Sequence, residues 1–293
     1  MSPLISIGQI IDHSLDAYVK HFSAYLKVTV WYFAVFILSA IGTLLGPAGN
    51  AEFLTEQGLL SGLQITGMVI SQATSTIGIF VISIWIYITL LQIVKKTIKG
   101  EPVNEKMVGA NTWKLFLPYA LVAILLGLIM GSPLLLLIPG IGMLVFNSIL
   151  ATSAWLGATG ILMTLLGILG GIVLLIIFTV WFAFPGFLLI LDGVPAMKTF
   201  RASKELVKNR FWPVFMRLMI PKMLFAIIVV AVQIGFYLLE VFFMVNLASL
   251  GESFLYHLST IVTAGLNFGI MALSLPLFVV ADYLIYDSLK TNR

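Results

Sequence analysis

Long apolar runs without charge dominate the chain. Asp, Glu, Lys and Arg are absent from four stretches, residues 28–51, 57–94, 115–191 and 253–281. A helix needs about 20 apolar residues to cross a hydrocarbon core of about 30 Å, so each stretch is long enough for a crossing. The apolar residues are continuous rather than alternating, which favours helices over the strands of a barrel. The pattern predicts six spans, at 24–46, 66–94, 115–148, 158–190, 214–246 and 257–284.

Basic residues gather between alternate spans. All sixteen occur as Lys20 with Lys27, within 95–114, within 198–222, or as Lys290 with Arg293. The connections at about 47–62, 149–157 and 247–256 contain no Lys or Arg. By the positive-inside rule, both termini and the basic segments are expected in the cytoplasm, in a multi-pass protein of the plasma membrane.

The third span contains two helix-breaking residues. Pro133 and Pro139 lie in the stretch "GSPLLLLIPGIG", residues 131–142. If 115–131 and 133–149 were separate crossings, the basic segment 198–222 would lie outside, against the charge pattern. We therefore expect six spans, with 131–149 as a kinked, extended or re-entrant continuation.

A repeated pattern precedes every second span. The stretches are "DAYVKHFSAY", "NTWKLFLPY" and "ELVKNRFWPVF", and Phe22, Phe116 and Phe211 align at intervals of 94 and 95 residues. The alternative is chance resemblance among apolar segments. We expect one membrane domain, 1–293, made of three repeats at 1–95, 96–190 and 191–293, each an amphipathic helix followed by a helical hairpin.

Composition agrees with a membrane protein. Apolar residues make up 60% of the 293 residues and charged residues 10%, against about 25% in a soluble domain. The chain has no cysteine, which excludes disulfides and thiolate sites within it. Asp12 and Asp16 precede the first Lys, so no cleaved signal peptide is expected.

The most charged segment is "AMKTFRASKELVKNRFWPVF", residues 196–215. As one helix, it places Ala196, Met197, Phe200, Val207 and Phe211 on an apolar stripe, with Lys204 at the edge of the stripe. Such a helix suits the membrane interface, where a basic residue near anionic lipid gains about 1 kcal/mol. Anchoring and orientation alone are the simpler interpretation. The candidate headgroup contacts are Lys198, Arg201, Lys204, Lys208, Arg210 and Trp212.

The N-terminal segment has the same construction. Ser6 and Gln9 have the spacing of a capping box. The expected apolar face of the following helix consists of Ile7, Ile11, Leu15, Tyr18 and Phe22.

These two segments carry a family resemblance. The stretches "SIGQIIDHSLDAYVKHFSAYL" and "PAMKTFRASKELVKNRFWPVF" resemble the membrane domain found beside the catalytic part of some glycerophosphoryl diester phosphodiesterases. They are also similar to related stand-alone six-span proteins of bacteria and archaea. The matching positions are Gly8, Leu15, Tyr18, Phe22, Ala202, Ser203, Leu206, Val207 and Phe211. The family's hydrolase activity belongs to a separate soluble barrel that these residues do not contain. The resemblance therefore implies a membrane module rather than a phosphodiesterase.

Polar residues and prolines within the spans are further candidates. Gln233 and Glu240 lie in the fifth span, and Pro185 and Pro276 are expected to break the fourth and sixth. Kinks and interfacial anchoring are the simpler interpretation, and broken helices lining a substrate site are the alternative. The pairs Gly127–Gly131 and Gly167–Gly171 have the spacing of close helix contacts.

The sequence contains no catalytic or phosphate-binding motif. We therefore expect no enzymatic activity, no metal and no cofactor. The predicted function is a membrane module that organises lipids or partner proteins. The alternative is a transporter or permease component for an apolar or amphiphilic solute, which a polar cavity reaching mid-depth would favour. Expected partners are membrane lipids, including anionic headgroups, and another protein or a second copy of the chain, but no nucleic acid.

Overall fold

The computed structural model describes residues 4–47, 61–103, 105–150, 153–247 and 251–291. Within these ranges the chain forms helices joined by turns, without a strand. Six helical segments are long and apolar enough to cross a membrane: Phe22–Leu45, Gly62–Ile98, Met107–Ile149, Ala154–Asp192, Phe211–Asn246 and Glu252–Thr291. Each coincides with one predicted span, and the chain is an all-α polytopic membrane protein. Arg293 and the connection at 48–60 lie outside the described residues.

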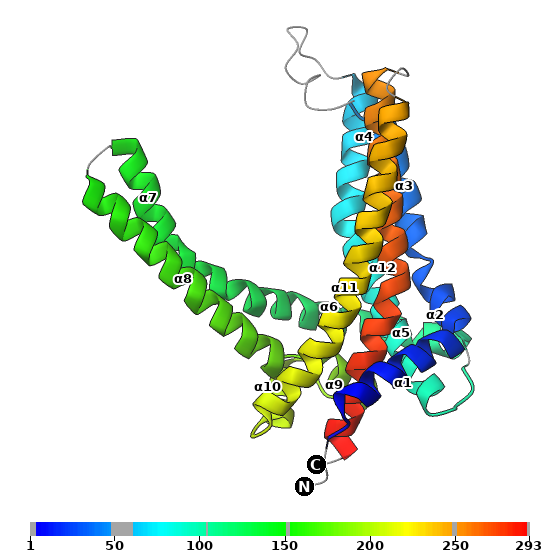
Figure 1. Cartoon of the computed structure of the whole chain (residues 1–293). Helices are drawn as coiled ribbons and strands as arrows, with labels where there is room; N and C mark the ends of the chain where they lie inside the picture. Colours follow the sequence, from blue (N-terminus) through cyan, green and yellow to red (C-terminus); the bar gives the residue numbers. More distant parts are fainter. Residues whose placement is uncertain (1–3, 48–60, 104, 151–152, 248–250, 292–293) are drawn as a thin grey trace. The chain divides into compact units, whose positions relative to one another are not determined.

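Several spans consist of more than one helix (Figure 1). The first contains α2 (Phe22–Thr29) and α3 (Tyr32–Leu45), and the second α4 (Gly62–Ala73), a π-helical stretch (Thr74–Gly78) and α5 (Ile79–Ile98). The third contains α6 (Glu105–Gly131), a 3-10 stretch (Ser132–Leu137) and α7 (Ile138–Leu150), and the fourth α8 (Ala154–Trp181) and α9 (Pro185–Asp192). The others are α11 (Phe211–Asn246) and α12 (Glu252–Thr291). Outside the six segments lie α1 (Ile7–Lys20) and α10 (Ala196–Val207).

The segment 131–149 continues the third span as helix. The 3-10 stretch joins α6 to α7 without an intervening loop. Pro133 and Pro139 each occupy the second residue of a helical piece, where the missing N–H costs little. The two prolines therefore change the helix type without interrupting the helical segment.

The chain divides into two compact units, which we describe separately. The hairpin unit comprises Leu117–Leu218 with Leu289–Arg293, and the bundle unit comprises Ser2–Phe116 with Met219–Ser288. These limits do not follow the boundaries of the three expected repeats. The three-fold repeat and the single domain stay predictions.

In the hairpin unit, glycines bring α8 against α7 and the 3-10 stretch. A Cβ atom on Gly140 would lie 2.4 Å from the Thr164 nitrogen, and one on Gly167 would lie 2.5 Å from the Leu136 carbonyl oxygen. Only glycine permits backbones at these distances, so the predicted role of Gly167 is confirmed. The prediction for Gly127 and Gly131 is wrong, because a Cβ on either would meet nothing within 4 Å.

Most of the hairpin surface is apolar and exposed. Of the 18 most apolar consecutive residues within Ala154–Asp192, only 11% are buried inside the protein. Exposed side chains of α8 include Leu162, Leu165, Leu169 and Val173. A surface of this kind requires a lipid environment.

At the end of the hairpin unit, an ion pair joins distant parts of the sequence. The Lys290 ammonium donates to the Asp192 carboxylate at 2.6 Å. Asp192 is the last residue of α9, and Gly193 follows with a left-handed φ of 67°. This contact fixes the end of α9 within the unit.

In the bundle unit, the core surrounds the middle of α5, from Ile84 to Val94. Ile86, Ile88 and Leu90 have no exposed surface. Hydroxyl contacts join the surrounding helices: Tyr25 to Thr97 at 3.0 Å, Tyr32 to Ser83 at 3.2 Å and Thr89 to Thr112 at 3.0 Å. These bonds satisfy polar groups that would otherwise be costly inside the bundle.

A second glycine contact joins α3 and α4 of the bundle unit. A Cβ on Gly42 would lie 2.6 Å from the Ser71 nitrogen, and one on Gly67 would lie 2.4 Å from the Gly46 nitrogen. The two helices therefore run side by side with touching backbones (Figure 1).

The N-terminal helix α1 packs within the same unit. The predicted capping box is confirmed, since Ser6 and Gln9 exchange hydrogen bonds of 3.1 and 3.2 Å. The Ile5 amide donates to Ser288 Oγ at 3.0 Å and the Tyr18 hydroxyl to the Leu273 carbonyl at 2.9 Å. The fully buried residues of α1 are Ile10 and Ser14, whereas Leu15 is 40% exposed. The most buried residues thus differ from the expected apolar face, of which Ile7, Ile11 and Tyr18 are partly buried, because these contacts orient the helix.

Candidate functional site

The fourth span breaks at Pro185, as the sequence predicts. α8 ends at Trp181, Phe182 and Phe184 have non-helical φ values of −114° and −118°, and α9 begins at Pro185. A break of this kind leaves backbone groups without helical partners, and these groups are costly to bury unpaired.

Ser203 of α10 supplies the missing partners. Its hydroxyl donates to the Trp181 carbonyl at 2.7 Å and accepts from the Phe184 amide at 3.2 Å. Ser203 is completely buried. The hydroxyl therefore spans the break and attaches α10 to α8 and α9 within the hairpin unit.

The buried face of α10 differs from the predicted apolar stripe. The buried residues are Thr199, Ser203, Leu206 and Val207, whereas Met197 is 67% exposed. Of the predicted stripe, only Val207 belongs to this buried face. Two hydroxyl residues lie inside: Ser203 bonds to the broken backbone, whereas Thr199 donates to the Ala196 carbonyl of its own helix at 2.6 Å.

The predicted continuous helix through Phe211 is also wrong. α10 ends at Val207, and Asn209 has a left-handed φ of 66°, which asparagine tolerates better than most residues. Lys208 caps the helix end and Arg210 lies in the turn before α11. Both residues thus lie beyond the last turn of α10.

The outer face of α10 is basic. Lys198, Arg201 and Lys204 are exposed, and the Arg201 guanidinium contacts Glu205 at 2.9 Å. That pair is worth little, because the side chains are 88% and 48% exposed. The Lys204 ammonium lies 4.0 Å from the centre of the Trp181 ring, a cation–π distance.

An open pocket of about 430 Å³ lies beside these side chains. We call it the basic pocket, and it is lined by Trp181, Arg201, Lys204, Glu205, Val207, Lys208, Asn209 and Phe211. It contains three cationic groups, one carboxylate and one indole. This set suits an anionic oxygen group, since Lys and Arg offer only donors.

The other three predicted headgroup residues do not line the basic pocket. Lys198 is exposed on α10, and Arg210 is half-buried in the turn. Trp212 is 65% exposed, with its ring edge-on to Phe211 and Phe215 at 5.5 and 5.8 Å between ring centres. Sequence reasoning missed Trp181, although its place at the end of a long apolar helix is typical of an interfacial indole.

Glu240 and Gln233 lie seven residues apart on α11, in the bundle unit. Glu240 is 9% exposed and accepts hydrogen bonds from Ser259 at 3.0 Å and Thr263 at 2.5 Å. The Gln233 amide donates to Asn267 at 3.0 Å. These partners repeat every four residues on α12, a spacing that sequence reasoning overlooked.

The remaining intramembrane candidates are divided between the units. Pro276 is buried inside the uninterrupted helix α12, so the expected break there is wrong. Membrane helices tolerate such a proline when neighbouring groups compensate for the lost bond. Pro185 belongs to the hairpin unit, and Gln233, Glu240 and Pro276 belong to the bundle unit.

A cavity of about 390 Å³ lies beside α11 and α12 in the bundle unit. Its walls are mainly apolar, with Val232, Phe236, Leu266 and Ile270 among them. Gln233 and Glu240 do not line it. The cavity is therefore suited to hydrocarbon rather than to a polar solute.

Two groups at the end of α1 have perturbed pKa values. Burial raises the pKa of the Tyr18 hydroxyl, which keeps it protonated as the donor to Leu273. Burial, with a smaller contribution from the Lys20 ammonium, lowers the pKa of His21 and favours its neutral form. Across the described residues, no three His, Asp or Glu side chains are grouped so that they would hold a metal ion.

Comparisons of the chain with protein-family models, with curated proteins and with solved structures found no match.

Proposed function

We propose that the chain is a multi-pass module of the plasma membrane, without catalytic activity, that organises lipids or partner proteins through contacts between α10 and anionic headgroups. The basic pocket is the observation that carries this proposal. It brings Arg201, Lys204 and Lys208 around the indole of Trp181, at the end of a 28-residue apolar helix.

The attachment of α10 supports this function. Because Ser203 bonds to both sides of the break at Pro185, the helix is held at the end of α8. An indole at the end of an apolar helix favours the headgroup level, and cations beside it gain about 1 kcal/mol each near anionic lipid. The geometry therefore suits a phosphate or other anionic headgroup at the membrane surface.

The distribution of charge supports an orientation with both termini in the cytoplasm. The basic ends of the spans carry Lys20, Lys95 and Lys99 in the bundle unit and the α10 cations in the hairpin unit. The family resemblance described above supports the same proposal of a module rather than a hydrolase.

Transport of an apolar or amphiphilic solute is the second candidate. The hydrogen-bonded groups of Glu240 and Gln233 between two membrane helices favour it, since polar groups within membrane spans mark solute paths in many transporters. The apolar lining of the neighbouring cavity favours the module instead.

The test uses the full-length protein purified in neutral detergent and mixed with phosphatidylglycerol or phosphatidylcholine. One variant replaces Lys198, Arg201, Lys204 and Lys208 with Gln, and a control replaces Lys20, Lys96, Lys99 and Lys114 with Gln. Both lose the same charge. We expect the α10 variant to retain phosphatidylglycerol about tenfold less well by native mass spectrometry, and the difference to shrink with added salt.

Equal losses in the two variants would mean that only net charge attracts the lipid, and the α10 proposal would be abandoned. No preference for phosphatidylglycerol over phosphatidylcholine in the unaltered protein would have the same consequence. Inorganic phosphate in competition distinguishes a free anion from a lipid headgroup.

A further inference from the structure

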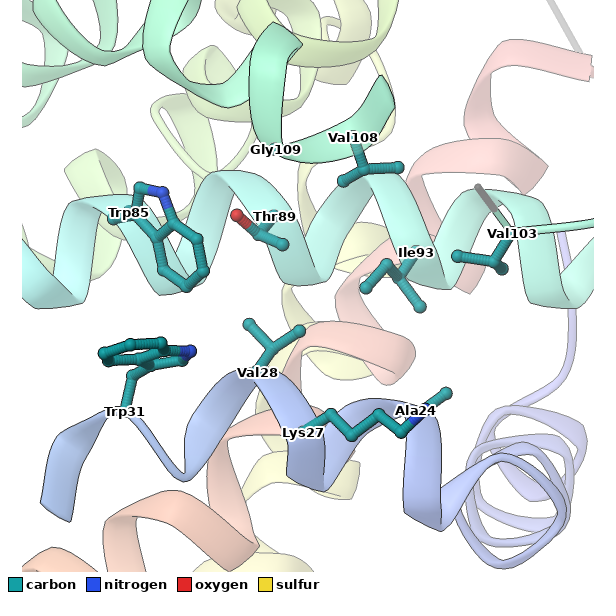
Figure 2. Close-up of a pocket in the computed structure, with 10 residues that line it drawn as sticks. All are labelled: Ala24, Lys27, Val28, Trp31, Trp85, Thr89, Ile93, Val103, Val108 and Gly109. Carbon is teal, nitrogen blue, oxygen red and sulfur yellow. The ribbon is translucent and has the colours of Figure 1, made fainter. Parts of the chain in front are cut away.

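A second cavity, in the bundle unit, lies between α2, α5 and the first turns of α6. Its volume is about 180 Å³ (Figure 2). Lys27 and Trp31 come from α2 and the turn that follows it, four residues apart, and Trp85, Thr89 and Ile93 come from one face of α5. Val103, in the connection between α5 and α6, lies at the end of the cavity nearest Ile93 (Figure 2).

The two ends of this cavity differ in chemistry. At one end the rings of Trp31 and Trp85 meet edge to face, with 6.2 Å between their centres. Lys27 supplies a positive charge on the wall, away from the indole pair (Figure 2). Thr89 lies on the wall between the indole pair and Lys27 (Figure 2). Its hydroxyl is hydrogen-bonded to the Thr112 hydroxyl at 3.0 Å. The cavity therefore combines a cation with an apolar aromatic end.

On each of the two helices the indole lies further into the span than a lysine, although only Lys27 of the two lysines lines the cavity. Trp31 lies four residues beyond Lys27, about 6 Å further into the first span. Trp85 lies ten residues before Lys95, about 15 Å from the basic end of the second span. In a bilayer the ammonium then lies near headgroup level, and the indole pair lies deeper, toward the hydrocarbon.

We infer that this cavity binds an anionic amphiphile with a single alkyl chain, whose head contacts Lys27 and whose chain begins between Trp31 and Trp85. The volume is close to the roughly 150 Å³ that accommodates a benzene-sized ligand in an apolar protein cavity. That space fits the first part of one chain and excludes two chains side by side. A fatty acid and a single-chain phosphate monoester share this chemistry.

A choline lipid does not fit the same order of groups. Its quaternary ammonium would need the indole faces, while its phosphate would need Lys27. In a lipid headgroup the ammonium lies on the water side of the phosphate. Here the indoles lie on the membrane side of Lys27, which is the opposite arrangement.

The inference is independent of the basic pocket, which belongs to the hairpin unit. Its test uses the full-length protein in phosphatidylcholine nanodiscs, with quenching of tryptophan fluorescence by amphiphiles that carry a dibrominated chain. The probes are a fatty acid, its methyl ester and a single-chain phosphate monoester. Bromine quenches only nearby indoles, so the signal reports the position of the chain.

We expect saturable quenching by at least one anionic probe and much weaker quenching by the ester. Lys27→Gln should raise the half-saturating concentration about tenfold, because a charged contact is lost, whereas Lys27→Arg and the control Lys99→Gln should not. Trp31→Phe and Trp85→Phe should each reduce the quenched amplitude, and the control Trp155→Phe, at an exposed indole of α8, should not. The tighter of the two anionic probes identifies the source of the ligand.

Three results would overturn the inference. The first is equal binding of the ester and the acid, and the second is an equal effect of Lys27→Gln and Lys99→Gln. The third is quenching that disappears with Trp155 rather than with Trp31 or Trp85. Each would show that the probe partitions into the bilayer without occupying the cavity.

Discussion

Replacing Ser203 with alanine isolates the contact that attaches α10 to the break in the fourth span. The hydroxyl contacts the Trp181 carbonyl at 2.7 Å and the Phe184 amide at 3.2 Å, and both Ser203 and Phe184 are fully buried. Ser203→Ala removes both bonds without adding bulk. The Trp181 oxygen and the Phe184 N–H then lose this partner in a site that excludes water.

The expected cost follows from these two groups. A buried donor or acceptor that loses a hydrogen-bond partner costs about 1–3 kcal/mol, so the loss of both bonds costs about 2–4 kcal/mol after partial relaxation of the break. If local opening at residues 182–185 becomes easier by that amount, its equilibrium constant rises at least about 30-fold. The amide of Phe184 should exchange with solvent deuterium faster by the same factor.

The assay is amide hydrogen exchange on the full-length protein in nanodiscs, followed by mass spectrometry of peptides that cover the break. Ser253→Ala is the matched control, because Ser253 is exposed near the start of α12. If exchange at Phe184 rises no more in Ser203→Ala than in Ser253→Ala, the hydroxyl does not hold the break and the reasoning is refuted. An increase spread over all of α8 would indicate general destabilisation instead.

Two further predictions concern packing and orientation. Gly167→Ala should destabilise the hairpin by about 1–3 kcal/mol in thermal unfolding, because its methyl would lie 2.5 Å from the Leu136 carbonyl oxygen. The control Gly127→Ala, whose methyl would meet nothing within 4 Å, should be neutral or stabilising by up to about 1 kcal/mol. Equal effects of the two substitutions would refute the glycine contact. Because the chain has no cysteine, a single introduced cysteine reports on which side of the membrane its residue lies. In intact cells, a thiol reagent that cannot cross the membrane should label Ser253→Cys and should not label Glu101→Cys. The reverse result would exclude the proposed orientation.

The spans could be predicted from the sequence because insertion into a membrane depends mainly on the hydrophobicity of a continuous segment. An apolar segment that crosses a membrane must be helical and about 20 residues long, so six apolar segments and their basic connections were sufficient. Local chemistry was equally predictable where it involves neighbours in sequence. The capping box of Ser6 and Gln9 and the break at Pro185 belong to this class.

Contacts between distant residues were not predictable in the same way. The buried face of α10 differs from the predicted stripe because Ser203 bonds to the break between α8 and α9, and a hydrophobicity pattern contains no information about that contact. The partners of Glu240 lie on α12, and the pattern of α11 contains no information about them. The cavity between α2 and α5 pairs Trp31 with Trp85, which are 54 residues apart.

The contact of α1 with the last span has a consequence for the order of assembly. The Ile5 amide and its acceptor Ser288 are separated by 283 residues. At about 5–20 residues per second, a ribosome needs roughly 15–60 s to make the intervening chain. During that interval α1 exists without α12, and the side chains that α12 later helps to bury, such as Ile10, have no protein partner there. The membrane surface can bind an apolar helix face in the meantime. Docking of α1 is therefore a late step in biogenesis, and it follows insertion of the final helix rather than guiding it.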